Sequence, residues 1–133
     1  MPSPVQFQSI AEQYDLRLVV LFGSQATGQM HSRSDADVAI WTERPLSVEE
    51  RLELWGALTR LFETETDLTE MNRAEPLLLF QIASTGRLLY KAQDLAWENF
   101  KSYAYRRYWD SAKFFADMAR YVSRRAEEMR RAG

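Results

Sequence analysis

Two short runs of strand-forming residues, separated by a polar loop, constrain the fold of this chain most strongly. Residues 16–22 (LRLVVLF) are almost continuously apolar and β-branched at their centre, and Gly23 ends the run. Residues 35–41 (DADVAIW) form a second run, after a loop that contains glycines and serines. Such runs are typical of strands buried on both faces of a sheet. We therefore expect a sheet that is covered by helices.

The flanking segments predict two of those helices. Apolar residues at helical spacing indicate a helix over residues 4–14, and a capping box formed by Ser47 and Glu50 begins a second helix that runs to about Glu63. The side chains expected to form the apolar stripe of this second helix are Leu52, Trp55, Leu58 and Phe62.

The following segments predict two more strands and a short helix. Strands are expected over residues 66–71 and 87–90; between them Pro76 opens a helix and Gly86 caps it. The resulting order of elements predicts an α+β fold, a small mixed β-sheet flanked by helices. Periodicity alone leaves the order of the strands open.

The last third of the chain predicts one long helix. No glycine or proline occurs from Arg87 to Ala132, and the residues from Asp94 onward are helix-forming. An unbroken helix from Asp94 would be about 55 Å long, longer than the diameter of so small a domain. It must therefore break near Asp110 or project. We accordingly divide the chain into a domain over 1–95 and a helical extension over 96–133.

Composition removes several kinds of chemistry. The 133 residues include no cysteine and one histidine, His31, so thiolate metal sites, disulfides and histidine-rich metal sites are excluded. No apolar run is long enough to span a membrane and no signal peptide is evident, so a soluble cytoplasmic protein is expected. The net charge of −2 divides into −7 for residues 1–100 and +5 for residues 101–133.

Asp35 and Asp37 are the strongest candidates for a chemical role. Side chains alternate along a strand, so both carboxylates project from one face, about 7 Å apart. Mg²⁺ is the natural cation for such oxygen ligands, and Asp67, which lies in a later predicted strand, is the best candidate for a third carboxylate. Gly23 and Ser24 end the first strand, where a backbone N–H and a hydroxyl can receive phosphates.

Taken together, these residues resemble a known family. The pair Gly23-Ser24, ten intervening residues and then Asp35-Ala36-Asp37 are similar to the signature of the DNA polymerase β-type nucleotidyltransferase superfamily. The surrounding residues resemble its small prokaryotic members, the minimal nucleotidyltransferases. Asp67 and the following residues, which include Asn72-Arg73, match the later part of their pattern. The resemblance covers roughly residues 5–95.

The resemblance implies a two-metal transferase. In such a site Asp35 and Asp37 hold two Mg²⁺ ions, while Asp67 completes the site and helps to deprotonate the acceptor hydroxyl. Gly23 and Ser24 grip the phosphates of the substrate, ATP. Many relatives carry an arginine directly after the glycine-serine pair, where this chain has Gln25, so Arg33 is the candidate for that positive charge.

The resemblance also implies a partner. Minimal nucleotidyltransferases are antitoxins that transfer AMP from ATP to a tyrosine hydroxyl of a HEPN-domain ribonuclease toxin. We expect such a toxin to bind the helical extension over 96–133, and we expect neither a membrane nor a nucleic acid as a direct partner. Two alternatives stay open: transfer to a small hydroxylated acceptor such as an antibiotic, and a non-catalytic antitoxin that acts by binding alone.

Aromatic and apolar residues of the extension form the surface on which a partner could bind. One stripe follows steps of three, four or seven residues, and a second stripe mixes aromatic and charged side chains, a mixture common at interfaces. The first stripe comprises Phe100, Ala104, Tyr108, Phe115, Val122, Ala126 and Met129, and the second Tyr103, Arg107, Asp110, Phe114, Asp117 and Tyr121.

Overall fold

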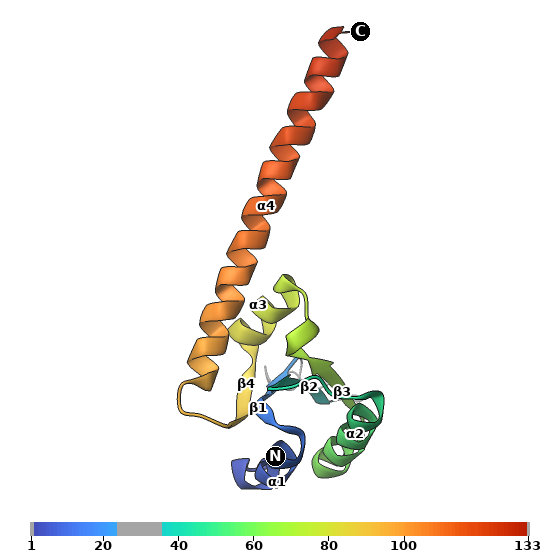
Figure 1. Ribbon diagram of the computed structural model, residues 1–133, viewed down its shortest axis with the longest axis vertical. Helices are drawn as coiled ribbons and strands as arrows, with labels where there is room; N and C mark the ends of the chain where they lie inside the picture. The colour runs from blue at the N-terminus through green and yellow to red at the C-terminus, as the bar shows by residue number, and fades with distance from the viewer. Residues whose placement is uncertain (1, 24–35, 133) are drawn as a thin grey trace.

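The computed structural model describes residues 2–23 and 36–132, and within them a four-stranded sheet lies between two pairs of helices (Figure 1). This arrangement confirms the predicted α+β fold. The elements are α1 (Pro4–Tyr14), β1 (Leu16–Phe22), β2 (Ala36–Thr42), α2 (Val48–Phe62), β3 (Thr66–Glu70), the 3₁₀ helix η1 (Met71–Arg73), α3 (Pro76–Thr85), β4 (Arg87–Lys91) and α4 (Ala96–Ala132).

The sheet is mixed and has the strand order β3-β2-β1-β4. β1 pairs antiparallel with both β2 and β4, whereas β2 pairs parallel with β3. The parallel pair requires a crossover, and α2 supplies it. Sequence periodicity could not decide this order, because it predicts which side chains are buried and carries no information on which strands pair.

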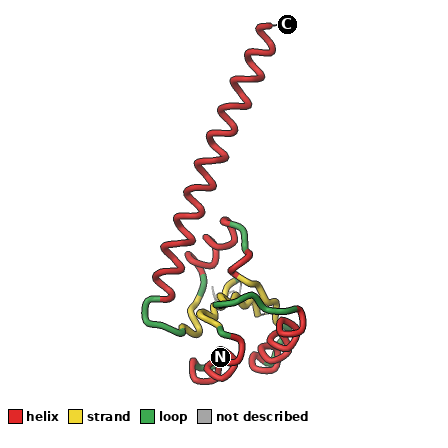
Figure 2. The backbone as a smooth tube through the Cα atoms, viewed as in Figure 1, coloured by secondary structure: helices red, strands yellow, loops and turns green. Residues whose placement is uncertain are grey.

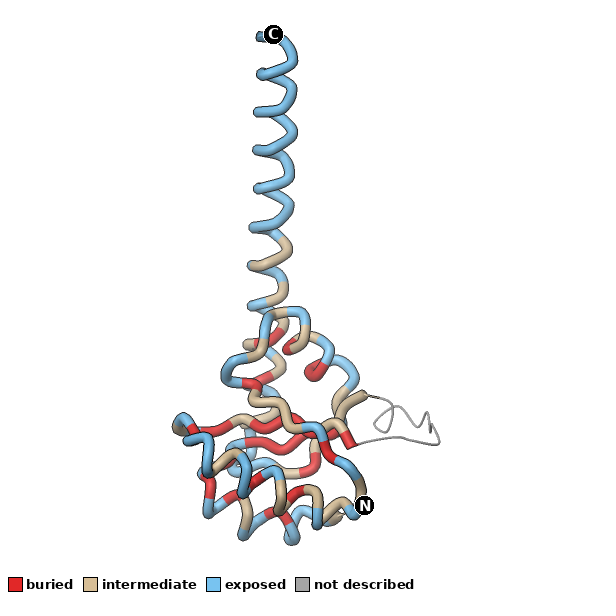
Figure 3. The backbone as a smooth tube through the Cα atoms, turned by 90° about the vertical axis from the view of Figure 1, so that its right-hand side faces the viewer, coloured by how far each residue is buried: buried red, intermediate tan, exposed pale blue. Residues whose placement is uncertain are grey.

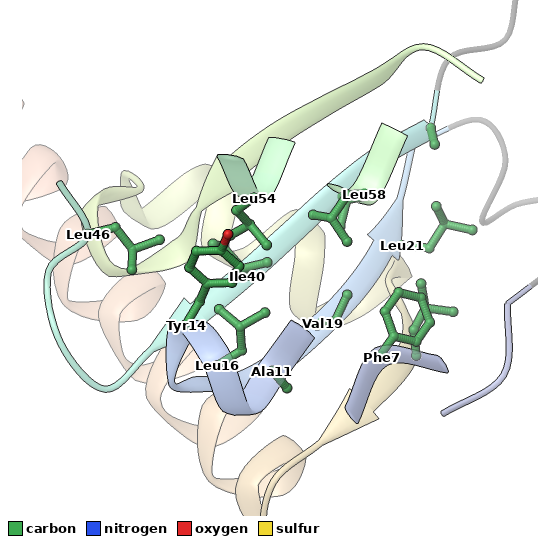
Figure 4. Close-up of a cluster of buried hydrophobic side chains, with 13 residues drawn as sticks. Phe7, Ala11, Tyr14, Leu16, Val19, Leu21, Ile40, Leu46, Leu54 and Leu58 are labelled. Carbon is green, nitrogen blue, oxygen red and sulfur yellow. The ribbon is translucent and has the colours of Figure 1, made fainter. Parts of the chain in front are cut away.

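Each face of the sheet has its own core. Alternate residues of β1 divide between the two cores: Val19 and Leu21 pack with α1 and α2, while Leu18 and Val20 pack with α3 and α4. Figure 4 shows the first core, in which Phe7, Ala11 and Tyr14 of α1 meet the sheet and α2. Both faces of β1 are therefore covered, as its continuous apolar run predicts.

The expected buried stripe of α2 is partly wrong. Leu54 and Leu58 are fully buried, whereas Leu52 and Trp55 are 62% and 45% exposed. Leu54 lies one helical turn before Leu58, so these two face α1 and the sheet while Leu52 lies on another side of the helix. Trp55 is exposed because it lies at the margin of α2 beside β3, where its ring nitrogen has a polar role described below.

A network of charges holds the beginning of α2. The predicted capping box is confirmed: Glu50 N–H donates to the Ser47 hydroxyl at 3.1 Å, and Ser47 N–H donates to the Glu50 carboxylate at 3.1 Å. Arg44 donates two further hydrogen bonds to that carboxylate, at 3.0 and 2.7 Å, and one to Asp15 at 2.8 Å. These bonds tie the start of α2 to the turn after α1.

Asn72 and Gly86 make close contacts at opposite ends of the sheet. Asn72 of η1 accepts a hydrogen bond from Thr42 N–H at 3.0 Å and donates one to Thr42 C=O at 2.8 Å, so its amide pairs with the last residue of β2. Gly86 ends α3 with an extended backbone, and a Cβ there would clash with Ile82 C=O and with Val20. Close packing is therefore what requires glycine at this cap.

α4 is one unbroken helix of 37 residues, so the extension projects and does not break near Asp110. Its first turns pack against α3 and the sheet, where Phe100 and Ala104 are buried. Figures 1 and 2 show the rest of the helix leaving the body, and Figure 3 shows that its distal half is exposed on all sides. No helix in the described part of the chain is long and apolar enough to cross a membrane.

Candidate functional site

Three of the residues predicted to form the site lie at one end of neighbouring strands. Asp37 pairs in register with Phe22 of β1 on one side and with Asp67 of β3 on the other. Gly23 directly follows Phe22. Register partners on adjacent strands lie about 5 Å apart, so the sheet brings Asp37 and Asp67 together across one strand spacing.

Both carboxylates project from the same face of the sheet. Val38 of β2 and Leu68 of β3 pack into the core formed by α1 and α2, so the preceding residues, Asp37 and Asp67, face the side of α3 and α4. Asp37 is partly exposed and Asp67 is exposed. The two side chains therefore form a solvent-accessible acidic pair at one end of β2 and β3.

Gly23 leaves space that a side chain would remove. Its φ of +79° lies in the left-handed region, which favours glycine. A Cβ at this position would collide with the Oδ2 atom of Asp37. The backbone at the end of β1 thus approaches the Asp37 carboxylate more closely than any other residue type would allow.

Hydrogen bonds from neighbouring elements fix the position of Asp67. The ring N–H of Trp55 donates to the backbone oxygen of Thr66 at 2.6 Å, which anchors the first residue of β3 to α2. Ala36 N–H donates to Glu65 C=O at 2.9 Å, which begins the pairing between β2 and β3 at the same end. Trp55 is a positioning residue that sequence periodicity assigned to the core.

Glu70 lies on the opposite face from Asp67, as the alternation of the strand predicts, and it is mostly buried. Its side chain is 11% exposed and forms an ion pair with Arg51 of α2 at 2.9 Å. This carboxylate holds α2 against β3 and does not contribute to the acidic pair.

The other predicted site residues lie outside the described residues. They are Ser24, Arg33 and Asp35, together with Gln25 and His31 of the same loop. Asp35 immediately precedes the first residue of β2 in the sequence, and Ser24 immediately follows Gly23. Their roles stay predictions from the sequence.

The described part of the site is compatible with a divalent cation. Two carboxylates on adjacent strands supply oxygen ligands, which suit Mg²⁺, and the missing Cβ of Gly23 lets the Asp37 carboxylate lie close to the backbone at the end of β1. Among residues 2–23 and 36–132, no group of three acidic or histidine side chains could hold a metal ion by itself. The sequence predicts that Asp35, which lies outside the described residues, completes the set of three carboxylates with Asp37 and Asp67.

A cavity of about 330 Å³ lies elsewhere on the molecule. Trp41, Phe100 and Tyr103 line its apolar side, and Arg17 and Glu43 lie at its polar side. Trp41 is four residues from Asp37 along β2, which places the cavity near the opposite end of the strand. It is therefore separate from the acidic pair.

Comparisons with known proteins agree with the fold. The family model described as Polymerase beta, Nucleotidyltransferase matches residues 6–95. A protein adenylyltransferase MntA from Shewanella oneidensis is 32% identical over 78 residues, which cover 59% of this chain and 56% of that protein. The chain thus spans little more than half the length of the curated relatives it matches.

Solved structures share the architecture over nearly the whole chain. A crystal structure of a toxin-antitoxin with AMP-PNP has a TM-score of 0.74 at 23% identity and covers 92% of this chain and 99% of the matched chain. A structure of tri-AMPylated Shewanella oneidensis HEPN toxin in complex with MNT antitoxin has a TM-score of 0.64 at 22% identity and covers 90% and 97%. At 23% and 22% sequence identity, the similarity between these structures and this chain shows a shared fold.

Proposed function

The chain belongs to the Polymerase beta nucleotidyltransferase family, and we propose that it transfers AMP from ATP to a tyrosine hydroxyl of a HEPN-domain toxin, which it thereby neutralises. The observation that carries this proposal is the register of Asp37 with Asp67, beside a glycine whose missing Cβ lets the Asp37 carboxylate lie against the end of β1. The names of the matched relatives support the same reaction: one is a protein adenylyltransferase, and another is an antitoxin in complex with an AMPylated toxin.

The proposed reaction is an in-line substitution at phosphorus. The acceptor oxygen forms a bond to the α-phosphorus of ATP, the bond from that phosphorus to the bridging oxygen breaks, and pyrophosphate leaves. Asp67 accepts the proton of the acceptor hydroxyl. Gly23 and Ser24 hold the β- and γ-phosphates at the end of β1, and Arg33 supplies positive charge to them.

Divalent metal fits the residues that surround this reaction. Asp35, Asp37 and Asp67 would hold two Mg²⁺ ions, which supply neutralisation of the phosphate charge when bound. The exposed position of Asp67 and the partial exposure of Asp37 leave the face open to a nucleotide and to a large acceptor. Catalysis in this site depends mainly on positioning and on electrostatics.

The two parts of the chain have different proposed roles. Residues 1–95 carry the transferase site, and residues 96–133 carry the surface that binds the toxin. The arm supplies an exposed surface for a protein, because Trp109, Phe115 and Met129 are each at least 67% exposed. Isolated large apolar side chains are common on protein surfaces, but a run along one projecting helix indicates an interaction site.

The decisive experiment measures covalent modification of the toxin. The chain and the HEPN-domain protein produced from the same genome are mixed with ATP and Mg²⁺, and the intact mass of the toxin is recorded. We expect a gain of one or more AMP units that localises to tyrosine. The gain should require Mg²⁺, and Asp37→Asn or Asp67→Asn should each reduce its rate at least about 100-fold.

Asp94→Asn is the matched control, because it removes an exposed carboxylate from the turn before α4. It should leave the rate within about twofold of wild type. Absence of any mass gain with the wild-type chain would overturn the proposal. Full neutralisation of the toxin by Asp37→Asn, with no modification, would instead support the non-catalytic alternative.

A further inference from the structure

The distal part of α4 carries a regular apolar seam. Its residues follow strictly alternating steps of three and four, which is the heptad spacing of helices that pair along their length. Large residues alternate with alanine at every layer. We call this set the alanine seam; it consists of Ala112, Phe115, Ala119, Val122, Ala126 and Met129.

The alanine seam continues a face that already binds a helix. Nearer the body, Tyr108 stacks on Phe80 of α3 with ring centroids 4.3 Å apart, and Ala104 is buried in the same core. Tyr108 precedes Ala112 by one more step of four residues. Beyond the start of α3, which runs antiparallel to α4, the same face of α4 continues uncovered, with Phe115 67% and Val122 58% exposed.

Alanine at every second position of the seam favours a helix as the binding partner. The small side chains of Ala112, Ala119 and Ala126 let another backbone approach closely, and the large residues between them fit into the gaps between the partner's side chains. From Ala112 to Met129 the seam spans about 26 Å, the length of a partner helix of about 17 residues.

The charged residues that flank the seam indicate the charge of the partner helix. In heptad terms the flanking positions are e and g, and the charged residues at these positions beside the seam are Arg125 and Arg130. The acidic residues Asp110 and Asp117 lie on the opposite side of the helix, and Glu127 and Glu128 lie outside the flanking positions. Glu128 forms an exposed ion pair with Arg125 at 3.4 Å, whereas Arg130 forms no ion pair within the described part of α4, so a partner's carboxylates would meet Arg130 directly and would compete with Glu128 for Arg125. A partner helix with carboxylates beside its apolar face would therefore complement the seam.

We propose that the alanine seam binds an acidic amphipathic helix of the partner protein, with large apolar residues at heptad spacing between the alanines and with Asp or Glu opposite Arg125 and Arg130. The inference rests on the proposed function for the identity of that protein, a HEPN-domain toxin. It adds the face of α4 that binds, the element that is bound and the charge of that element.

A second copy of this chain fits the seam less well. In a parallel pair, Arg125 at position g would face Arg130 at position e of the other copy, and like charges there are repulsive. In an antiparallel pair, g positions meet g positions and e positions meet e positions, and neither set contains a carboxylate in this segment. In both arrangements the two arginines lack an acidic partner across the interface.

The first test uses two synthetic helical peptides as probes with the full chain. Both carry leucine at the seam-facing positions, and one has glutamate and the other lysine at the flanking positions. We expect the glutamate peptide to bind at least about tenfold more tightly, with an affinity that falls as salt is raised. Equal binding of the two peptides would overturn the proposal.

The second test uses two arginines that each form one exposed ion pair within α4. Arg125→Glu changes a residue that flanks the seam and pairs with Glu128, while Arg131→Glu makes the same charge change on the opposite side of the helix, where the arginine pairs with Glu127. Arg125→Glu should weaken binding of both the glutamate peptide and the HEPN toxin about tenfold, and Arg131→Glu by less than about twofold. Equal effects would overturn the proposal.

Ala119→Leu separates close packing from general hydrophobicity. The substitution adds apolar surface and keeps high helix propensity, so a loosely apolar interface would be strengthened. We expect weaker binding, with unchanged helix content in circular dichroism. Tighter binding, or a stable dimer of the wild-type chain in sedimentation that Ala119→Leu dissociates, would overturn the proposal.

The outcomes also separate this proposal from the proposed function. If the toxin is bound and modified normally by both Arg125→Glu and Ala119→Leu, the seam proposal fails and the proposed function stands. If the glutamate peptide binds with the predicted pattern while the toxin is neither bound nor modified, the proposed function fails and the seam proposal stands for another acidic helix.

Discussion

At the scale of single residues, two small features control the geometry of the sheet. Gly23 places the end of β1 against the Asp37 carboxylate through a positive φ and the absence of a Cβ. At the other end of β2, the Asn72 amide satisfies both backbone groups of Thr42. Gly23 thus affects the geometry of the site, and Asn72 affects the stability of β2, the strand that carries Asp37.

Substitution of Gly23 by alanine should damage both stability and activity. The left-handed backbone should cost about 1–3 kcal/mol of unfolding free energy, and the clash should displace Asp37 and reduce AMP transfer. Gly56→Ala in the middle of α2 is the matched control. A Cβ there meets only Arg60 at 3.6 Å, so this variant should be about 0.5–1 kcal/mol more stable. Urea unfolding and a transfer assay measure the two effects; an active, stable Gly23→Ala enzyme would contradict this account.

Substitution of Asn72 by alanine should destabilise the sheet. The change removes the partner of the buried Thr42 N–H, so we expect a loss of about 1–3 kcal/mol of unfolding free energy. Arg73→Ala, one residue later, should change stability by less than about 0.5 kcal/mol, because the arginine is exposed and lies 4.0 Å from Glu70. Similar losses for the two variants in chemical unfolding would show that the amide does not hold the strand.

At the scale of elements, the start of α2 and the length of α4 are the informative features. Arg44 joins the Glu50 carboxylate to Asp15, so the capping of α2 also fixes its position relative to α1. α4 changes character along its length, from a packed helix at Phe100 to an exposed one after Tyr108. Isolated helices are marginal in water, so the distal part should gain order when a partner covers it.

The ion pair at the start of α2 predicts acid sensitivity. The hydrogen bonds from Arg44, and then those from Ser47, lower the pKa of Glu50 from 4.5 to about 2. Because the folded-state pKa is the lower one, this stabilisation is complete above about pH 5 and is lost as the pH falls toward 2. Glu50→Gln should therefore lower the thermal midpoint at pH 7, and the difference from wild type should shrink by pH 3. A constant difference at both pH values would contradict this cause.

At the scale of the whole molecule, an acidic body carries a basic projecting arm. The body has its site at one end of the sheet, and the arm places an apolar seam with flanking arginines beyond it. Under the proposed function, the arm would hold the partner while the site modifies it. The core of the body includes the beginning of α4, since Phe100 and Ala104 are buried against α3 and the sheet.

Truncation should separate the two parts. A chain that ends at residue 110 loses only exposed or half-buried residues of α4, so its unfolding free energy should stay within about 0.5 kcal/mol of the full chain. A chain that ends at residue 99 loses Phe100 as well and should be destabilised by at least about 3 kcal/mol. Calorimetry of both would decide; equal stability of the two truncated chains would place the whole of α4 outside the core.

The sequence by itself determined the elements and the chemical type of the site. Apolar runs, the capping box at Ser47 and the interval without glycine or proline predicted every strand and every α-helix of the described residues to within about two residues, because these signals act over short stretches of chain. The 3₁₀ helix η1 was not predicted. The spacing from Gly23 to Asp37 also placed the chain in a family resemblance that the family model supports.

Only the tertiary structure decided which residues from distant segments of the chain become neighbours. The pairing of Asp37 with Asp67, the burial of Leu54 in place of Leu52, and the role of Trp55 in anchoring β3 all depend on contacts between segments far apart in the chain. The same holds for α4, where local propensity allows a helix but only packing shows where the body ends. Such choices are made by burial and steric fit, which a local pattern does not encode.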